Sequence, residues 1–287
     1  MSTELKNRFD FVYLFDIQDG NPNGDPDAGN MPRIDPETRQ GIVTDVCLKR
    51  KVRNYVLVSK DIDNQLENGY DIFIREKAVL DKIVNHVWDD SEVKNAKKVD
   101  EQKKAAKKLL CSQFYDIRAF GAVIATSGKT DQVRGPIQLT FSRSIDPIEP
   151  VPHSITRMAV TKEDEKKERT MGRKSTVPYG LYVCHGFVSA NLAHQTGFSE
   201  EDLQLFFDAL KNMFDVDRSA ARGLMSARRL IVFKHNSKLG CAPANQLFDL
   251  VHVKKSDDVA VARSFGDYTI TVDKDKLPQG VEVVEEI

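Results

Sequence analysis

The segment FDFVYLFD at residues 9–16 decides the fold. Its aromatic residues alternate with Asp10, Val12, Leu14 and Asp16, and this period of two predicts a β-strand with one aromatic face. We predict that this strand is central in its sheet. The chain then runs into residues 20–41, where Gly, Pro, Asn and Asp are too dense for regular structure. A long loop is expected there, and loops of this length are usually functional or disordered.

A helix is predicted after this loop, from a Thr44 cap to about Ser59. Its apolar stripe consists of Leu48, Val52, Tyr55 and Val56. Three cations, Lys49, Arg50 and Arg53, then share a neighbouring face. Such a patch could hold successive phosphates of a nucleic acid.

The middle of the chain is predicted to contain a short strand at residues 71–75 and a mainly helical region at 77–111. Residues 92–108 hold seven lysines and three acids, which is typical of an exposed insertion. Strand-like segments follow at 119–126 and 135–143. The polar, charged segment 154–179 is interpreted as a protruding hairpin or arm.

The last third begins with a strand at residues 181–188 and a helix whose start has the capping-box spacing of Ser199 and Asp202. Further strands are predicted at 230–233 and 268–272, before an acidic tail.

The order strand, helix, strands, helix, strand predicts an α+β fold, namely a ferredoxin-like (RRM-type) palm with large insertions. The palm is expected to comprise residues 1–59, 114–156 and 180–235. A helical insertion would occupy 60–113, a thumb-like arm 157–179, and C-terminal strands with an acidic tail 236–287.

Composition bounds the function only broadly. The chain has 287 residues with 42 basic and 43 acidic side chains, an ordinary soluble composition. Its longest apolar or glycine run, at 119–125, is too short to span a membrane. The start of the chain lacks an apolar signal core and the four cysteines form no CxxC pair, so a cytoplasmic protein with reduced thiols is expected.

The charges are segregated along the chain. Residues 10–37 hold seven acids and one base, whereas 157–174 hold seven bases and four acids, and 215–238 six bases and two acids. Such basic patches are expected where phosphates bind, although a single charged run is more often a solvated face. The acidic loop at 19–37 or the tail at 282–286 is expected to meet the basic face of a neighbouring copy.

Motifs for metal or nucleotide chemistry fail on inspection. Residues 19–24 match the first half of a calcium loop, but its twelfth position is Asn30 rather than glutamate, so no metal site is predicted. SGKT at 127–130 lacks the first glycine of a phosphate-binding P-loop, since Val123 stands there. The six histidines have no diagnostic spacing, which lowers the expectation of an enzyme. No cofactor is predicted.

The sequence resembles the type I-C CRISPR Cascade backbone subunit of the RAMP superfamily. The resemblance rests on FDIQDGNPNGDPDAGNMPRIDPETRQGIVTD at 15–45 with VCLKRKVRNYV after it, DIRAFGAVI at 116–124, GPIQLTFSRSIDPI at 135–148 and TMGRKSTVPYGLYV at 170–183. It extends to about residue 233.

That resemblance implies a noncatalytic subunit whose copies stack head to tail along one CRISPR RNA, with an arm that kinks the guide and leaves other bases free to pair with target DNA. Repeat-processing, large and small Cascade subunits would be further partners. The residues expected to bind RNA are Lys49, Arg50, Arg53, Arg118, Arg157, Arg169, Met171, Arg173 and Lys174.

Two other functions stay open. One is a RAMP-superfamily endoribonuclease, metal-dependent or histidine-dependent, that uses a histidine or an aspartate such as Asp16 or Asp19. The other is a P-loop ATPase, which the failed SGKT match makes a distant third.

Overall fold

A computed structural model describes residues 3–126, 129–159 and 170–287. It has a mixed α/β fold around an eight-stranded antiparallel sheet with the order β16-β13-β1-β12-β10-β4, in which β9 and β11 also pair with β12. The strands are β1 (Phe9–Gly20), β4 (Gln40–Val43), β9 (Ile137–Leu139), β10 (Ser142–Pro147), β11 (Val151–Arg157), β12 (Thr170–Val188), β13 (Leu224–His235) and β16 (Val281–Glu286). The long loop of the prediction carries two short strands, β2 (Gly24–Asp25) and β3 (Met31–Pro32), and the 3-10 helix η1 (Pro26–Ala28).

Strand β1 is central, as predicted. It pairs with β12 along one edge and with β13 along the other. Phe11, Tyr13 and Phe15 are fully buried under the helices on one face, and Val12 and Leu14 are buried in a second core on the opposite face. Apolar cover on both faces therefore places this strand in the middle of three layers.

The helical face consists of α1 (Asp45–Ser59), α6 (Ala190–Thr196) and α7 (Glu200–Val216). Both predicted helix starts are confirmed: the Thr44 hydroxyl caps α1, and Ser199 with Asp202 forms a reciprocal capping box on α7. Helices α1 and α7 pack against each other through their apolar stripes. The side chains next to the α1 stripe are thereby fixed on one side of the sheet.

The opposite face is covered by the C-terminal segment. This segment contains α8 (Ala244–Phe248), β14 (Val251–Lys255), η2 (Phe265–Asp267), β15 (Tyr268–Val272) and η3 (Lys274–Lys276). The predicted strand at 268–272 is confirmed, but the expectation of an acidic tail at 282–286 is wrong, because these residues belong to β16, which pairs with β13. Val281 and Val283 lie on one face of this strand, which forms in spite of the glutamates around them.

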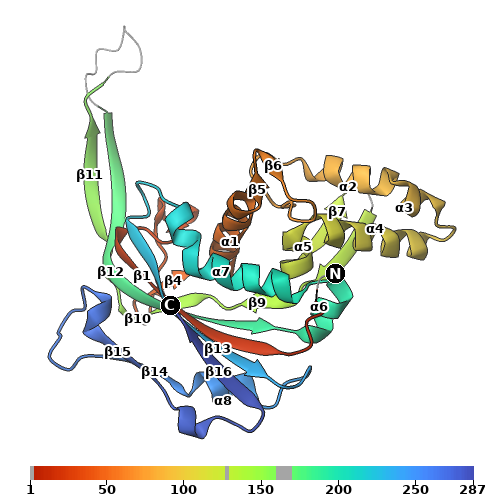
Figure 1. The fold of residues 1–287 in the computed structure, drawn as a ribbon. Helices are drawn as coiled ribbons and strands as arrows, with labels where there is room; N and C mark the ends of the chain where they lie inside the picture. The colour runs from red at the N-terminus through yellow and green to blue at the C-terminus, as the bar shows by residue number, and fades with distance from the viewer. Residues whose placement is uncertain (1–2, 127–128, 160–169) are drawn as a thin grey trace.

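A helical insertion projects from the helical face (Figure 1). Its elements are β5 (Asp61–Ile62), β6 (Gln65–Leu66), α2 (Leu80–Asp89), α3 (Ser91–Asn95), α4 (Val99–Gln113), α5 (Tyr115–Phe120), β7 (Gly121–Thr126) and β8 (Lys129–Arg134). The elements from α2 to β8 share a core of their own that includes Val87 and Leu110. The strand predicted at 71–75 is absent from this described region, because the amides of Phe73 and Ile74 donate to the Asp116 carboxylate instead of to a neighbouring strand.

Lys129 and Thr130 of the motif SGKT begin β8, which pairs antiparallel with β7, whereas a phosphate-binding P-loop leads from a strand into a helix. Residues 127 and 128 themselves lie outside the described part of the chain. Within the described residues, no helix has the length and apolarity needed to cross a membrane.

The cysteines differ in accessibility. Burial raises the pKa of Cys111 and of Cys184 to about 11, whereas Cys241 is exposed. Because the thiolate is the reactive form, we expect iodoacetamide at neutral pH to label Cys241 first and to leave Cys111 and Cys184 unmodified until the protein unfolds. Peptide mass spectrometry measures the order, and early labelling of Cys184 would contradict this packing.

Candidate nucleic-acid interface

The cations of α1 lie beside an aromatic ring of the insertion. The Lys49 ammonium is 5.7 Å and the Arg53 guanidinium 5.3 Å from the centre of the Phe120 ring. Both are also paired: Lys49 Nζ is 2.9 Å from Asp45, and Arg53 Nε is 2.7 Å from Asp116. The structure therefore brings Lys49 and Arg53 together, as predicted, but each already has an acidic partner.

The two acidic partners, Asp45 and Asp116, differ in how deeply they are buried. Asp45 is an i−4 neighbour in the first turn of α1, and the side chains of Lys49 and Asp45 are 12% and 23% exposed. Asp116 is only 1% exposed and its side chain also accepts the amides of Phe73 and Ile74, so Arg53 neutralises a buried charge. Arg50 is exposed on the adjoining face of the same helix. Arg50 is thus the most available cation of the three.

A long hairpin, formed by β11 and β12, projects from the sheet on the side where the helices lie (Figure 1). In the register of this hairpin, Arg157 lies opposite Thr170 and Ser154 lies opposite Arg173. The side chains of Arg157 and Arg173 are exposed, and the Lys174 ammonium donates to the Ala220 carbonyl. The arm predicted from sequence is therefore a hairpin with cations along both of its strands.

Large apolar side chains on this hairpin are also exposed to solvent. Met158 is 67% and Met171 is 74% exposed, and Ile155 is half exposed. Met171 and Arg173 are two residues apart in a strand, so they share one face. A strand face that offers an apolar side chain next to a cation suits a nucleic-acid backbone and its unstacked bases. The expected contact Arg169 lies outside the described residues.

The segment 217–223 joins this surface, although the sequence interpretation assigned no site to it. It lies between α7 and β13, and the Ala220 carbonyl in it receives the Lys174 ammonium. Arg218 is exposed on it, and Arg222 is partly buried. The excess of bases at 215–238 was the signal in the sequence, but composition alone did not show that this segment lies against the arm.

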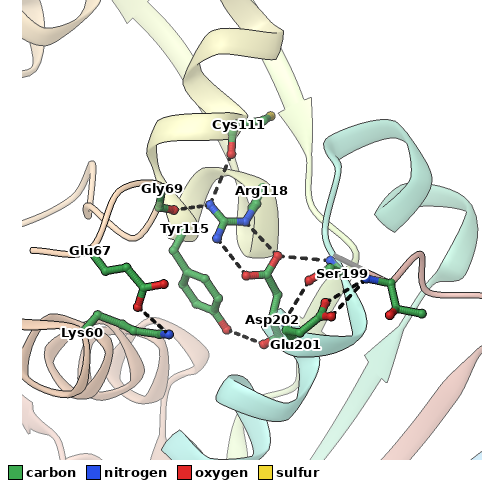
Figure 2. Close-up of polar contacts among 10 residues, drawn as sticks. Lys60, Glu67, Gly69, Cys111, Tyr115, Arg118, Ser199, Glu201 and Asp202 are labelled. Carbon is green, nitrogen blue, oxygen red and sulfur yellow. Dashed lines mark hydrogen bonds and ion pairs between the residues drawn. The ribbon is translucent and has the colours of Figure 1, made fainter. Parts of the chain in front are cut away.

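Arg118 does not belong to this surface, which corrects the expectation that it contacts RNA. Figure 2 shows its guanidinium bound to both carboxylate oxygens of Asp202, at 2.8 Å each, and to the carbonyls of Gly69 and Cys111. The Arg118 side chain is 8% exposed. Because Arg118 belongs to the fully buried helix α5 of the insertion and Asp202 to α7, this arginine links the insertion to α7.

The two carboxylates considered for catalysis lie apart from each other. Asp16 points to the face under the C-terminal segment, where it accepts the Tyr179 hydroxyl at 2.9 Å and pairs with Arg228 at 2.9 Å. Burial raises its pKa. Asp19 is exposed at the end of β1 with a left-handed backbone, φ 52°. The two aspartates therefore do not form one site.

The histidines are likewise dispersed. His235 is fully buried, with Nε2 2.9 Å from Asp10 and Nδ1 accepting the Cys241 amide. The ring thus contacts Asp10 through Nε2 and the Cys241 amide through Nδ1, and it links β13 to β1. Burial lowers the pKa of His185, which packs on Phe248. Among the described residues, no three acidic, histidine or cysteine side chains gather to hold a metal.

The acidic loop before α1 is ordered by its own side chains. Asn23 accepts the amide and hydroxyl of Thr44, so the asparagine of the failed calcium motif positions the start of α1. Asp35 accepts the amides of Glu37 and Thr38 and pairs with Arg143 at 2.8 Å. The expected contact loop is thus tied to strand β10.

The Arg143 contact, helped by the two amides, lowers the pKa of Asp35 from 3.8 to about 2. Because the folded pKa lies below the unfolded one, the carboxylate stabilises the loop above pH ~4 and loses this effect as the pH falls towards about 2. We expect a carboxyl NMR titration to give a midpoint near 2 for Asp35 and a higher midpoint in Arg143→Gln. An ordinary midpoint in the unsubstituted protein would contradict the contact.

Comparison with known protein families gives one match over most of the chain. A family model described as CRISPR-associated protein Cas7 matches residues 7–273. A curated relative from Haloferax volcanii, named CRISPR-associated protein Cas7, is 28% identical over 232 residues. That alignment covers 72% of this chain and 65% of the relative, so the chain spans less than two thirds of the relative's length.

Solved structures with a similar chain come from CRISPR complexes. One, titled "CRISPR RNA-guided surveillance complex, pre-nicking", has a chain with 13% identity and a TM-score of 0.49, covering 79% of this chain and 78% of its own. Another, a type III-B Cmr-beta complex bound to cognate target RNA, has a chain with 12% identity and a TM-score of 0.42, covering 79% and 61%.

Proposed function

The chain belongs to the family of CRISPR-associated protein Cas7, and on that premise we propose that it is a CRISPR RNA-binding backbone subunit of a type I-C Cascade surveillance complex. Several copies would assemble head to tail along one guide in the cytoplasm and present it for pairing with target DNA in antiviral defence. Repeat-processing, large and small subunits would complete the complex.

The family match over residues 7–273 carries this proposal. It is supported by the surface that α1, the hairpin and segment 217–223 form on one side of the sheet. Arg50, Arg157 and Arg173 are exposed there, and the exposed Met171 stands beside Arg173. Phosphate contacts of this kind hold a nucleic acid without selecting its sequence, as a subunit that must accept any guide requires.

We also propose that the palm is ferredoxin-like. Its support is the strand order β13-β1-β12-β10, with α1 between β1 and β10 in the chain and α7 between β12 and β13. This is the arrangement of two β-α-β halves around one sheet, with both helices on one face. The exposed hairpin then acts as the thumb.

We propose further that the subunit does not cleave RNA. Asp16 lies under the C-terminal segment and His235 is sealed in a pair with Asp10, so neither reaches the surface of α1 and the hairpin. An exposed aspartate such as Asp19 is the strongest competing candidate for cleavage chemistry.

One experiment separates these functions. Labelled repeat-containing guide RNAs of unrelated spacer sequence are incubated with the pure protein, with and without magnesium. We expect each guide to be bound with similar affinity and to stay intact. Cleavage that is lost in Asp19→Asn would establish the endoribonuclease instead, and absence of binding at low salt would contradict the RNA-binding role.

A further inference from the structure

Lys51 is the one cation of the α1 run KRK that faces inward. Its side chain is 2% exposed, between α1 and α7, and its ammonium pairs with Asp217, the residue that ends α7. The Phe214 ring lies 5.8 Å from the same ammonium. Burial lowers the pKa of Lys51, which expresses the cost of desolvating this charge.

The carboxylate that receives Lys51 also holds an arginine. Arg222 Nε is 2.6 Å from the same Asp217 oxygen to which Lys51 is bound. One acid therefore joins two bases, one from helix α1 and one from the segment 217–223. That segment is the part of the candidate interface that leads from α7 into β13.

The segment is clamped to two more elements. The Ala221 carbonyl accepts the Asn21 amide at 2.8 Å, at the end of β1, and the Ala220 carbonyl accepts the Lys174 ammonium from the hairpin. The backbones approach so closely that a Cβ on Gly20 would lie 2.1 Å from the Arg222 carbonyl oxygen. Gly223 has φ +59°, and a Cβ there would lie 2.3 Å from the Gln18 carbonyl oxygen. The segment thus connects α1, β1 and the thumb.

We propose that Lys51 is a positioning residue for RNA binding, which acts through Asp217 and Arg222 to hold segment 217–223 and, with it, the hairpin in a fixed relation to the exposed cations of α1. Lys51 itself does not touch RNA in this role. The inference rests on the proposed function, because it concerns the same interface.

The choice of residues supports this role over a purely stabilising one. A well-packed apolar pair at the same place is often as stable as a buried ion pair, so the charges are not needed for stability. What an apolar pair cannot do is hold Arg222, because that requires the Asp217 carboxylate. The ion pairs give the segment one defined position among the elements that carry the RNA-facing side chains.

The test compares the double variant Lys51→Met/Asp217→Leu with a matched control, Lys60→Met. Lys60 belongs to the C-terminal end of the same helix and pairs with Glu67 at 2.9 Å, away from segment 217–223. Binding of a labelled guide RNA is measured over a salt series, together with melting temperature and amide hydrogen exchange.

We expect the double variant to melt within a few degrees of the unsubstituted protein and to bind RNA about tenfold more weakly, the size of one lost charge-assisted contact. Its salt slope stays unchanged, because no phosphate contact is removed. Exchange rises at 217–223 and at the base of the hairpin, and Lys60→Met changes none of these quantities.

Three results would overturn the inference. Unchanged affinity in a folded double variant would show that the ion pairs do not position the interface. A slope reduced by roughly 0.7 would show that Lys51 contacts phosphate directly. If the double variant does not fold, Asp217→Asn is measured in its place. Unchanged RNA affinity in folded Asp217→Asn would also show that the ion pairs do not position the interface. Absence of RNA binding by the unsubstituted protein would instead reject the proposed function, and the inference with it.

Discussion

Replacement of Arg118 with methionine is expected to lower the free energy of unfolding by about 3–5 kcal/mol, the usual cost of breaking a buried ion pair from one side. The substitution leaves the Asp202 carboxylate, 4% exposed, without its cation. It also removes the donor to the carbonyls of Gly69 and Cys111. Urea unfolding followed by circular dichroism measures the loss, which we expect as a lower midpoint at constant slope.

The matched control is Lys254→Met. Lys254 pairs with Asp257 on the surface, with both side chains more than two-thirds exposed, so its loss is expected to change stability by less than about 1 kcal/mol. If Arg118→Met were as mild as this control and instead reduced the salt slope of RNA binding, Arg118 would contact RNA, as the sequence interpretation held.

The double variant Arg50→Ala/Arg173→Ala is expected to bind guide RNA about a hundredfold more weakly, because two charge-assisted contacts are removed. The two arginines are exposed, one on α1 and one on the hairpin, so stability is expected to stay unchanged. The slope of log affinity against log salt should become shallower by about 1.4, since each contact with a single strand contributes roughly 0.7. Fluorescence anisotropy over a salt series measures both quantities.

Two comparisons make this prediction specific. The loss should be the same for unrelated spacer sequences, because phosphate contacts do not distinguish bases. Lys254→Ala, which removes an exposed cation under the opposite face of the sheet, should bind RNA normally. A loss of affinity that depends on spacer sequence would place base-specific contacts at Arg50 or Arg173. An equal loss of affinity in Lys254→Ala would show that only the net charge of the protein matters.

The local elements of the palm were predictable because their signals are local. Alternation at residues 9–16 gives β1, and the side-chain caps at Thr44 and Ser199 fix the starts of α1 and α7. The arm was predictable as well, from a charged segment between two strands.

The site was harder to predict because the sequence does not show which charges meet. Arg53 and Arg118 have the same residue type as Arg50, yet each pairs with a buried aspartate far along the chain. Lys51 points inward because of its position on the helix, one step from Arg50. Only the packing of α1 and α5 separates structural cations from those that are free to bind phosphate.

The most direct test of the central claim is expression of the chain with and without a type I-C repeat-spacer transcript, followed by size exclusion with native mass and ultraviolet absorbance ratio. We predict a large assembly that contains intact RNA and forms only with the transcript. An RNA-free monomer in both cases, also after the other Cascade subunits are added, would contradict the proposal that this chain is the guide-binding backbone.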